Sequence, residues 1–263
     1  FLFEAATVSA IDLYVSPDGP MSSLAEARDA IRRIKAESGL TEPVTVHIAE
    51  GSYLLTEPVI FTPEDSGSEE CPIVYDAAGD KKPIISGGRV ISGFQQGEDG
   101  IWKVQIPDVK DGRWYFEQLY VNGRRAIRAR TPNEWYFYML EISETPVDSD
   151  HLYRRAAKAR QGDLDSLQNL NGQALRDVIL YVYNKWTVSQ RHIEQIDSEG
   201  PAIITVGQQQ KSYASWERNT RYHLENYRAA LDAPGEWFLD RDGTLYYKPL
   251  PGEDMEKAEV IEI

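Results

Sequence analysis

Short apolar runs separated by turn-forming residues dominate positions 44–88. The runs are rich in Val, Ile, Phe and Tyr, and they span residues 44–48, 58–61, 73–75 and 83–86. Runs of this length and composition predict β-strands. Gly, Pro, Asp and Ser fill the gaps, and no helical pattern lies between the runs. This stretch therefore predicts short strands in a sandwich, a barrel or a β-solenoid, and it excludes βαβ units.

One amphipathic helix is predicted before these strands, over residues 23–37. Its apolar stripe has helical spacing and consists of Leu24, Ala27, Ile31 and Ile34. Ser22 or Ser23 can cap the N-terminus, Glu26 completes a capping box, and Gly39 ends the helix. A helix in this position can cover the open end of a stacked sheet and protect its edge.

From residue 94 the pattern changes to longer strands that carry more Trp and Tyr. The predicted strands are residues 100–106, 116–122, 179–183, 202–206, 236–239, 244–248 and 258–263. Asn122-Gly123 and Asp242-Gly243 predict hairpin turns. The stretch between Asp150 and Leu175, which includes HLYRRAAKARQGDLDSLQNL, is predicted to be helical or loop-like. The last strand is interrupted by the end of the chain, so we expect more protein downstream.

Charge and composition narrow the classes of partner. The formal net charge of −14 would repel a phosphate backbone, which argues against a nucleic-acid partner. No apolar run is long enough to cross a membrane. The single cysteine, Cys71, excludes an intrachain disulfide. Residues 1–10 end in small residues and resemble either the tail of a secretion signal or an expression remnant.

Arginines and aromatic residues supply the candidate binding residues. Arg124 and Arg128 belong to an arginine cluster that can face a carboxylate-bearing sugar, or can pair with acids to hold two domains together. Trp135 and Tyr136 are candidates for sugar stacking, with core packing as the alternative. His192 can face a substrate cleft or can serve as a hydrogen-bonded structural group.

The sequence signals for catalytic and metal-binding residues are weaker than those for the binding residues. Asp240 with Asp242, and Asp163 with Asp165, are close in sequence, but turn formation explains both pairs better than catalysis does. The four histidines, His47, His151, His192 and His223, lack the spacing of metal ligands. We therefore assign no catalytic residue, no metal and no cofactor.

Several collinear segments resemble right-handed parallel β-helix glycoside hydrolases, most closely glycoside hydrolase family 141. They include GLTEPVTVHIAEGSYLLTEPVIFTPEDSGSEECPIVYDAAGD, FEQLYVNGRRAIRARTPN, WTVSQRHI and ENYRAALDAPGEWFLDRDGTLYYKPLPGED. The resemblance implies a mainly β fold in four segments. These are the remnant at 1–10, the capping helix and first β-helix coils at 11–93, an inserted barrel-like or sandwich-like β domain at 94–252, and a return strand at 253–263.

The same resemblance implies an activity. Members of the family are bacterial enzymes that hydrolyse glycosidic bonds of plant polysaccharides through paired carboxylates on later coils, beyond the position of Ile263. The chain itself is then expected to be inactive, to meet an oligo- or polysaccharide, and to work in the periplasm or outside the cell. Two alternatives remain open: a non-catalytic carbohydrate-binding or surface β-helix protein, and a polysaccharide lyase. The sequence does not predict an oligomeric state.

Overall fold

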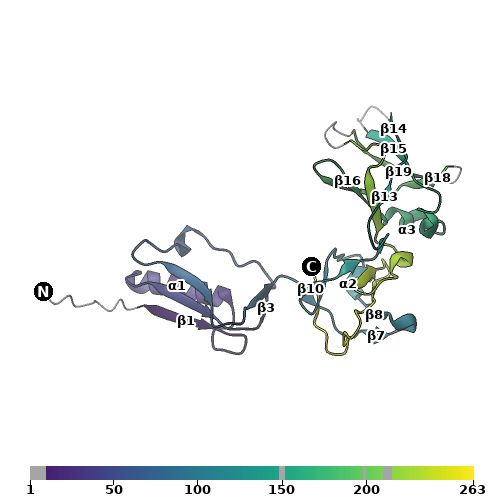
Figure 1. Ribbon diagram of the computed structural model, residues 1–263. Helices are drawn as coiled ribbons and strands as arrows, with labels where there is room; N and C mark the ends of the chain where they lie inside the picture. The colour runs from purple at the N-terminus through teal and green to yellow at the C-terminus, as the bar shows by residue number, and fades with distance from the viewer. Residues whose placement is uncertain (1–9, 148–151, 198–199, 210–214) are drawn as a thin grey trace. The chain divides into compact units, whose positions relative to one another are not determined.

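The computed structural model describes residues 10–147, 152–197, 200–209 and 215–263. The predicted remnant at 1–10 falls outside these ranges except for its last residue. The chain divides into two compact units, unit 1 (Phe1–Arg89) and unit 2 (Val90–Ile263). Strands outnumber helices in both units, so the prediction of a mainly β fold is confirmed (Figure 1). Among the described residues, no helix is both long and apolar enough to span a membrane.

Unit 1 is built from parallel strands. β1 (Ile11–Val15), β2 (Val44–Ile48) and β4 (Ile73–Ala77) form a three-stranded sheet in the order β1-β2-β4, and both pairings are parallel. β3 (Ser52–Leu54) and β5 (Ile84–Ser86) form a second, two-stranded parallel sheet. The apolar runs at 44–48, 73–75 and 83–86 therefore lie in strands, as predicted.

Two details of unit 1 differ from the prediction. Residues 58–61 were predicted to be a strand, and this is wrong, because they lie outside all strands. In contrast, Ser52 is one of the turn-forming residues predicted to fill the gaps between the runs, but it begins β3. Tyr53 explains the difference, since its ring is buried and its hydroxyl donates to the carbonyls of Val15 and Ala49. β3 alternates exposed, buried and exposed, but three residues are too few for this alternation to be recognised in the sequence.

Helix α1 (Leu24–Ser38) packs its apolar stripe on the three-stranded sheet, with Ala27 and Ile31 buried against Val44 and Val46. The Ser23 side chain accepts from the Glu26 amide, as the cap prediction requires, while the Glu26 carboxylate accepts from the Ser22 amide 2.6 Å away. A bidentate ion pair joins the helix to η1 (Pro63–Asp65). Its Arg32 Nε and Nη2 each lie 2.7 Å from an oxygen of Asp65.

The first part of unit 2 contains two sheets around a core that includes Phe116, Trp237 and Tyr247. The five-stranded sheet has the order β11-β21-β22-β8-β7, and the four-stranded sheet has the order β10-β9-β23-β6. Their strands are β6 (Arg89–Val90), β7 (Gln95–Gln96), β8 (Trp102–Gln105), β9 (Leu119–Val121), β10 (Arg124–Arg125), β11 (Ile127–Arg128), β21 (Glu236–Leu239), β22 (Thr244–Tyr247) and β23 (Val260–Glu262). The short helices here are η2 (Glu98–Gly100), α2 (Pro107–Lys110) and η5 (Arg228–Ala230).

Both predicted hairpin turns are present. Asn122 and Gly123 have φ of 52° and 72°, which the two-residue turn between β9 and β10 requires. Gly243, with φ of 87°, closes the turn between β21 and β22. A side chain at Gly243 would place a Cβ 2.6 Å from the carbonyl oxygen of Ile106, so this position demands glycine on two counts.

The predicted last strand is also present, as β23. It pairs antiparallel with β9, so that Val260 lies opposite Val121. The assignment of residues 253–263 to a further coil of a β-helix stays a prediction.

The second part of unit 2 contains two more sheets, in the orders β12-β20-β16-β17 and β14-β15-β19-β18, with β13 paired to β20. These strands are β12 (Arg130–Thr131), β13 (Phe137–Tyr138), β14 (Glu141–Pro146), β15 (Leu152–Lys158), β16 (Ile179–Tyr183), β17 (Val188–His192), β18 (Gln195–Asp197), β19 (Ala202–Gln208) and β20 (Arg221–Glu225). η3 (Asp165–Leu167) and α3 (Gly172–Arg176) lie between β15 and β16. None of the sheets formed by the described strands closes into a barrel.

The prediction of helix or loop between Asp150 and Leu175 is wrong for residues 152–158. Residues 152–158 form β15, which pairs with β14 on one side and β19 on the other. Alanines and arginines gave this segment a helical composition, but tertiary contacts override it. Arg155 is fully buried, bonds to Glu144 and to the Gln208 carbonyl, and lies 4.9 Å from the ring centroid of Trp216.

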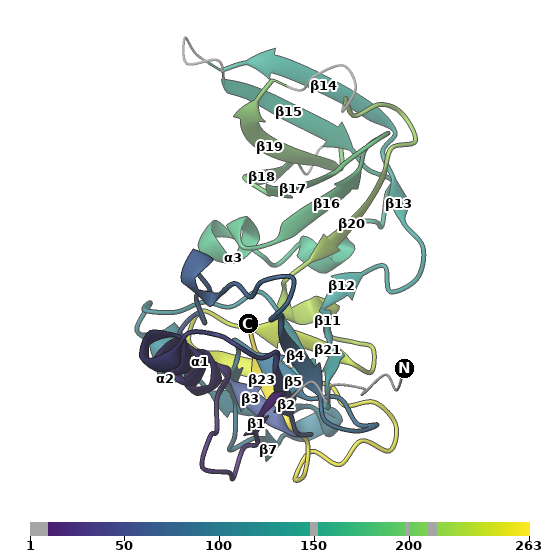
Figure 2. The ribbon, with the colours of Figure 1, turned by 90° about the vertical axis from the view of Figure 1, so that its left-hand side faces the viewer.

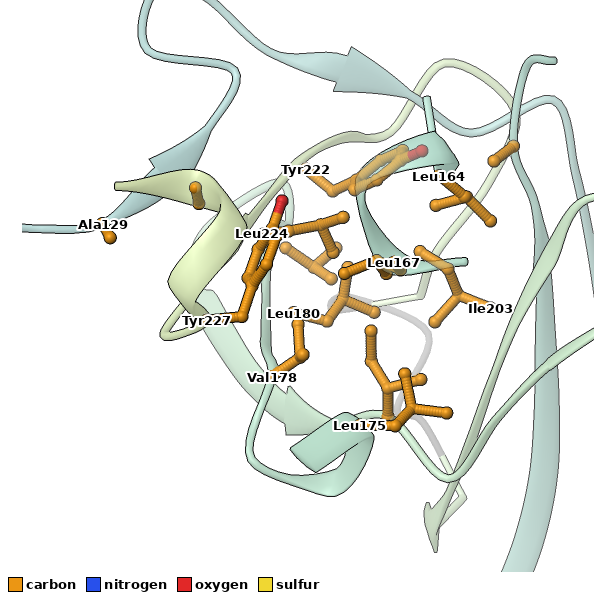
Figure 3. Close-up of a cluster of buried hydrophobic side chains, with 14 of the residues drawn as sticks. Ala129, Leu164, Leu167, Leu175, Val178, Leu180, Ile203, Tyr222, Leu224 and Tyr227 are labelled. Atoms are coloured by element: carbon orange, nitrogen blue, oxygen red, sulfur yellow. The ribbon is translucent and has the colours of Figure 1, made fainter. Parts of the chain in front are cut away.

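The core of this part is formed by side chains from both sheets and from the segment between β15 and β16 (Figure 3). The segment inserts Leu164, Leu167 and Leu175, and the strands contribute Leu180 and Leu224. Close packing of these leucines fixes one side of the β20–β16 pair.

Candidate functional site

The strands β20, β16 and β17 lie side by side in unit 2 (Figure 2). The two faces of the sheet β12-β20-β16-β17 differ chemically, because one is buried in the core and the other is only partly buried. Successive side chains of a strand point to opposite faces. Leu180 and Val182 of β16 are fully buried in the core, so Tyr181 and Tyr183 lie on the opposite face. His223 and Glu225 of β20 lie beside them, because His223 is opposite Tyr181 in the ladder. We call Tyr181, Tyr183, His223 and Glu225 the aromatic face.

His223 is the central residue of the aromatic face. Its ring stacks on Tyr181 with a centroid distance of 4.8 Å and an interplanar angle of 12°. Nδ1 lies 3.2 Å from the Tyr183 hydroxyl, and Nε2 lies 2.6 Å from Oε1 of Glu225. Both ring nitrogens therefore have partners, and only 2% of the residue is exposed. These bonds hold the two tyrosines in fixed orientations.

Tyr136 and Arg221 extend this arrangement. The Tyr136 ring meets the Tyr183 ring edge-to-face, with centroids 4.7 Å apart. The guanidinium carbon of Arg221 lies 5.1 Å from the Tyr136 centroid and 5.8 Å from the Tyr183 centroid. A planar guanidinium over aromatic rings is a favourable cation–π arrangement. Arg221 is thus held next to two rings while it stays exposed.

The electrostatic environment of the two tyrosines is mixed. Burial, the largest cause, raises the pKa of Tyr183, and the positive charges of Arg130 and Arg221 oppose this rise. Burial also raises the pKa of Tyr181, with a further contribution from the Glu225 charge. Both phenols therefore stay protonated at neutral pH and can donate or accept hydrogen bonds.

A cavity of about 290 Å³ lies beside Tyr183 and Arg221. Its charged lining consists of Lys185, Glu217, Arg218 and Arg221. The Lys185 ammonium pairs with Glu217 at 3.2 Å. In the described part of the chain, neither Arg218 nor Arg221 lies within ion-pair distance of a carboxylate. We call this cavity the cationic pocket.

A larger cavity of about 800 Å³ lies between the leucine-rich segment and β18. Leu164, Leu167 and Ile196 give it an apolar floor, and Asp165 and Glu194 are among its polar side chains. Tryptophan, tyrosine and phenylalanine are absent from its described lining. It therefore offers no ring on which a planar or cyclic ligand would stack.

The predicted binding residues are distributed over unit 2. Arg124 donates from Nη2 to the Tyr247 hydroxyl at 3.0 Å and lies 3.8 Å from Glu253. Arg128 donates to the Glu117 carbonyl at 2.6 Å and lies over the Trp237 ring. These contacts hold strands and loops of the first part of unit 2 together.

The predicted aromatic and histidine candidates have different surroundings. Tyr136 contacts Tyr183 of the aromatic face, whereas Trp135 is 79% exposed on the loop before β13. His192 lies at the end of β17, where its Nδ1 is 2.8 Å from the Arg176 carbonyl oxygen. The structure brings Tyr136 to the aromatic face and does not gather the five candidates into one site. Their roles in binding stay predictions.

Sequence reasoning missed Tyr183, His223, Arg221 and Trp186. Alternation in ILYVY was a usable signal, because two tyrosines at i and i+2 in a strand with a buried face must share the other face. Nothing in the sequence placed His223 between them, since β16 and β20 are about forty residues apart. Trp186, which is 82% exposed, lies in the connection between β16 and β17.

The acidic pairs take part in local structure. Asp242 accepts from the Thr244 amide at 2.8 Å within its hairpin, and Arg241 pairs with the distant Asp177. Asp163 accepts from the Tyr222 hydroxyl at 3.4 Å, next to η3. Within the described ranges, no group of three or more His, Cys, Asp or Glu side chains is arranged to hold a metal ion. His151 lies outside those ranges.

Comparisons with known proteins give the family. Residues 99–250 match the model of the GH141 insertion domain, and this match covers more than half of the 263 residues. The chain therefore belongs to the GH141 insertion domain family. The resemblance to glycoside hydrolase family 141 is confirmed at that level.

Two solved structures are similar to the chain. One is a glycoside hydrolase with a TM-score of 0.74 and 25% sequence identity, over 95% of this chain and 45% of that one. The chain thus spans less than half the length of that protein. The other, "The complex structure of XylC with xylose", has a TM-score of 0.36 and 17% identity, over 97% of this chain and 31% of that one, and we draw nothing from it. No curated protein matches the chain.

Proposed function

We propose that this chain is part of a glycoside hydrolase. The observation that carries the proposal is the similarity of 95% of the chain to a solved glycoside hydrolase, with a TM-score of 0.74. Membership of the GH141 insertion domain family supports the same conclusion. An oligo- or polysaccharide is then the ligand, and a plant-type polysaccharide is the proposed substrate.

The proposed architecture places catalysis outside the described residues. The parallel ladders β1-β2-β4 and β3-β5 support an assignment of unit 1 to the first coils of a right-handed parallel β-helix, with α1 as its cap. Unit 2 then contains the inserted domain. Paired carboxylates on coils that follow Ile263 would cleave the glycosidic bond, one as acid and the other as base or nucleophile. The proposed site of action is the periplasm or the extracellular space.

The test measures reducing sugar released from a panel of plant and host glycans. The full-length protein that contains this chain should release it from at least one glycan, and the 263-residue chain alone should release none. Activity of the chain alone would show that the catalytic carboxylates are not downstream. The proposal is falsified if the full-length protein releases no reducing sugar, or if its products are unsaturated and absorb in the near ultraviolet, as a lyase would produce.

A further inference from the structure

We propose that the cationic pocket of unit 2 binds a carboxylate-bearing sugar, the uronate unit of an acidic glycan. The inference rests on the proposed function only for the class of ligand, a saccharide. The location, the charge and the aromatic surroundings of the pocket come from this chain. It is a binding site separate from the proposed catalytic carboxylates.

Charge points to an anionic ligand. The protein carries a net charge of −14, yet the pocket lining contains three cations and one carboxylate. The carboxylate, Glu217, is already paired with Lys185. Arg218 and Arg221 therefore remain as guanidinium groups without a carboxylate partner among the described residues. Guanidinium and carboxylate match in planar, bidentate geometry, so these arginines are suited to a ligand carboxylate.

Arg221 is pre-organised for this role. Its guanidinium lies over the rings of Tyr136 and Tyr183, and Tyr183 is in turn bonded to His223. Stacking uses the face of the guanidinium and leaves the N–H groups at its edge available for an acceptor. Less side-chain entropy is then lost when a carboxylate binds. The aromatic face thus acts as the support of the pocket.

Aromatic exposure points to a sugar. Trp186, 82% exposed, directly follows the pocket residue Lys185. Trp135, 79% exposed, directly precedes Tyr136, which contacts the pocket residue Tyr183. Trp135 also has a φ of 62°, which a bulky residue seldom adopts. Exposed tryptophans offer apolar surfaces with a polar edge, and the flat face of a pyranose packs on such rings.

The size of the pocket limits what it holds. Ligand pockets usually enclose about 300–1,000 Å³, and this one has about 290 Å³. It therefore suits one sugar unit, with neighbouring units lying over the exposed tryptophans. A simple inorganic anion as the ligand would not explain why Trp135 and Trp186 are exposed, since it has no apolar face to pack on them.

Calorimetric titration of the 263-residue chain with oligogalacturonide tests the inference. Neutral xylo-oligosaccharide of the same length is the comparison. The acidic oligosaccharide should bind more tightly, and added salt should weaken its binding because the interaction is between charges. Arg221→Met should weaken it about tenfold, which corresponds to loss of one charge-assisted hydrogen bond.

Arg125→Met is the matched control. Arg125 is an exposed arginine on β10 that does not line the pocket, so its loss changes the net charge equally and should leave binding unchanged. Arg221→Lys keeps the charge without the planar fork and should give an intermediate affinity. Trp186→Leu should weaken the acidic and neutral oligosaccharides alike. Thermal unfolding of each variant confirms that it is folded.

Equal binding of acidic and neutral oligosaccharides, or unchanged binding in Arg221→Met, would overturn the inference. So would an equal loss of affinity in Arg125→Met. None of these measurements requires hydrolysis. If the chain fails to bind oligogalacturonide while the full-length protein still releases reducing sugar, this inference fails and the proposed function stands.

Discussion

The two faces of the β20–β16 pair differ although they are made by alternate residues of the same strands. Leu180, Val182 and Leu224 are fully buried on the core face. On the aromatic face, Tyr181 and Tyr183 are half-buried, and a shared histidine holds them in place. The core face gains stability from apolar area removed from water, whereas the aromatic face is ordered by directional bonds. One face of the sheet thus contributes stability, and the other face carries the polar and aromatic side chains that can contact a ligand.

The largest expected effect is on the core face. Leu224→Ala removes a fully buried side chain from the leucine core and should lower the free energy of unfolding of unit 2 by about 2–5 kcal/mol. Val188→Ala is the control, because Val188 is 53% exposed on β17 of the same sheet and its substitution should change the free energy of unfolding by less than about 0.5 kcal/mol. Urea titration followed by circular dichroism measures both. Equal losses would mean that the two sites do not differ in packing.

The next largest difference between the two faces is expected in how their tyrosines affect stability at alkaline pH. Burial, with the Asp163 charge, raises the pKa of Tyr222 on the core face far above its usual value. Above about pH 10 the unfolded chain loses this proton more readily than the folded one, so stability contributed by Tyr222 is present below that pH and is lost above it. Tyr222→Phe should therefore reduce the fall in melting temperature between pH 9 and pH 11.

Tyr183→Phe should reduce the same fall by less. Burial is the largest cause of the raised pKa of both tyrosines, and Tyr183 is only half-buried whereas Tyr222 is 1% exposed. Melting temperatures of both variants, measured at the two pH values, provide the comparison. An equal or larger effect of Tyr183→Phe would contradict the assignment of the stronger burial to the core face.

The smallest stability effect is expected at neutral pH on the aromatic face. Tyr183→Phe deletes the hydroxyl that lies 3.2 Å from Nδ1 of His223 but keeps the ring. His223 is only 2% exposed, so its Nδ1 is left without this partner in a buried position, and the loss should cost about 1–3 kcal/mol in the free energy of unfolding. A loss as large as that of Leu224→Ala would mean that the aromatic face is part of the folding core.

Some elements could be predicted from the sequence and others could not, for physical reasons that differ from one element to the next. β2, β16 and β21 were predicted with their observed bounds, because β-branched and aromatic residues dominate all three and turn-forming residues follow them. β15 was missed because a fully buried arginine takes a core position that sequence patterns reserve for apolar residues. The aromatic face was missed for a different reason. It is assembled by pairing distant strands, and sequence periodicity carries no information on partners.

The exposed tryptophans have an optical consequence. Trp135 and Trp186 face water, whereas Trp216 and Trp237 are 5% and 1% exposed. Indole emission depends on the polarity around the ring, so these two most exposed of the six tryptophans should contribute most to the red edge of the fluorescence spectrum, with a smaller contribution from Trp114, which is 37% exposed. A saccharide that covers either ring would shift and quench that component while the buried pair stays constant. The emission of Trp135 and Trp186 would thus report saccharide binding, and the emission of Trp216 and Trp237 would serve as the reference signal.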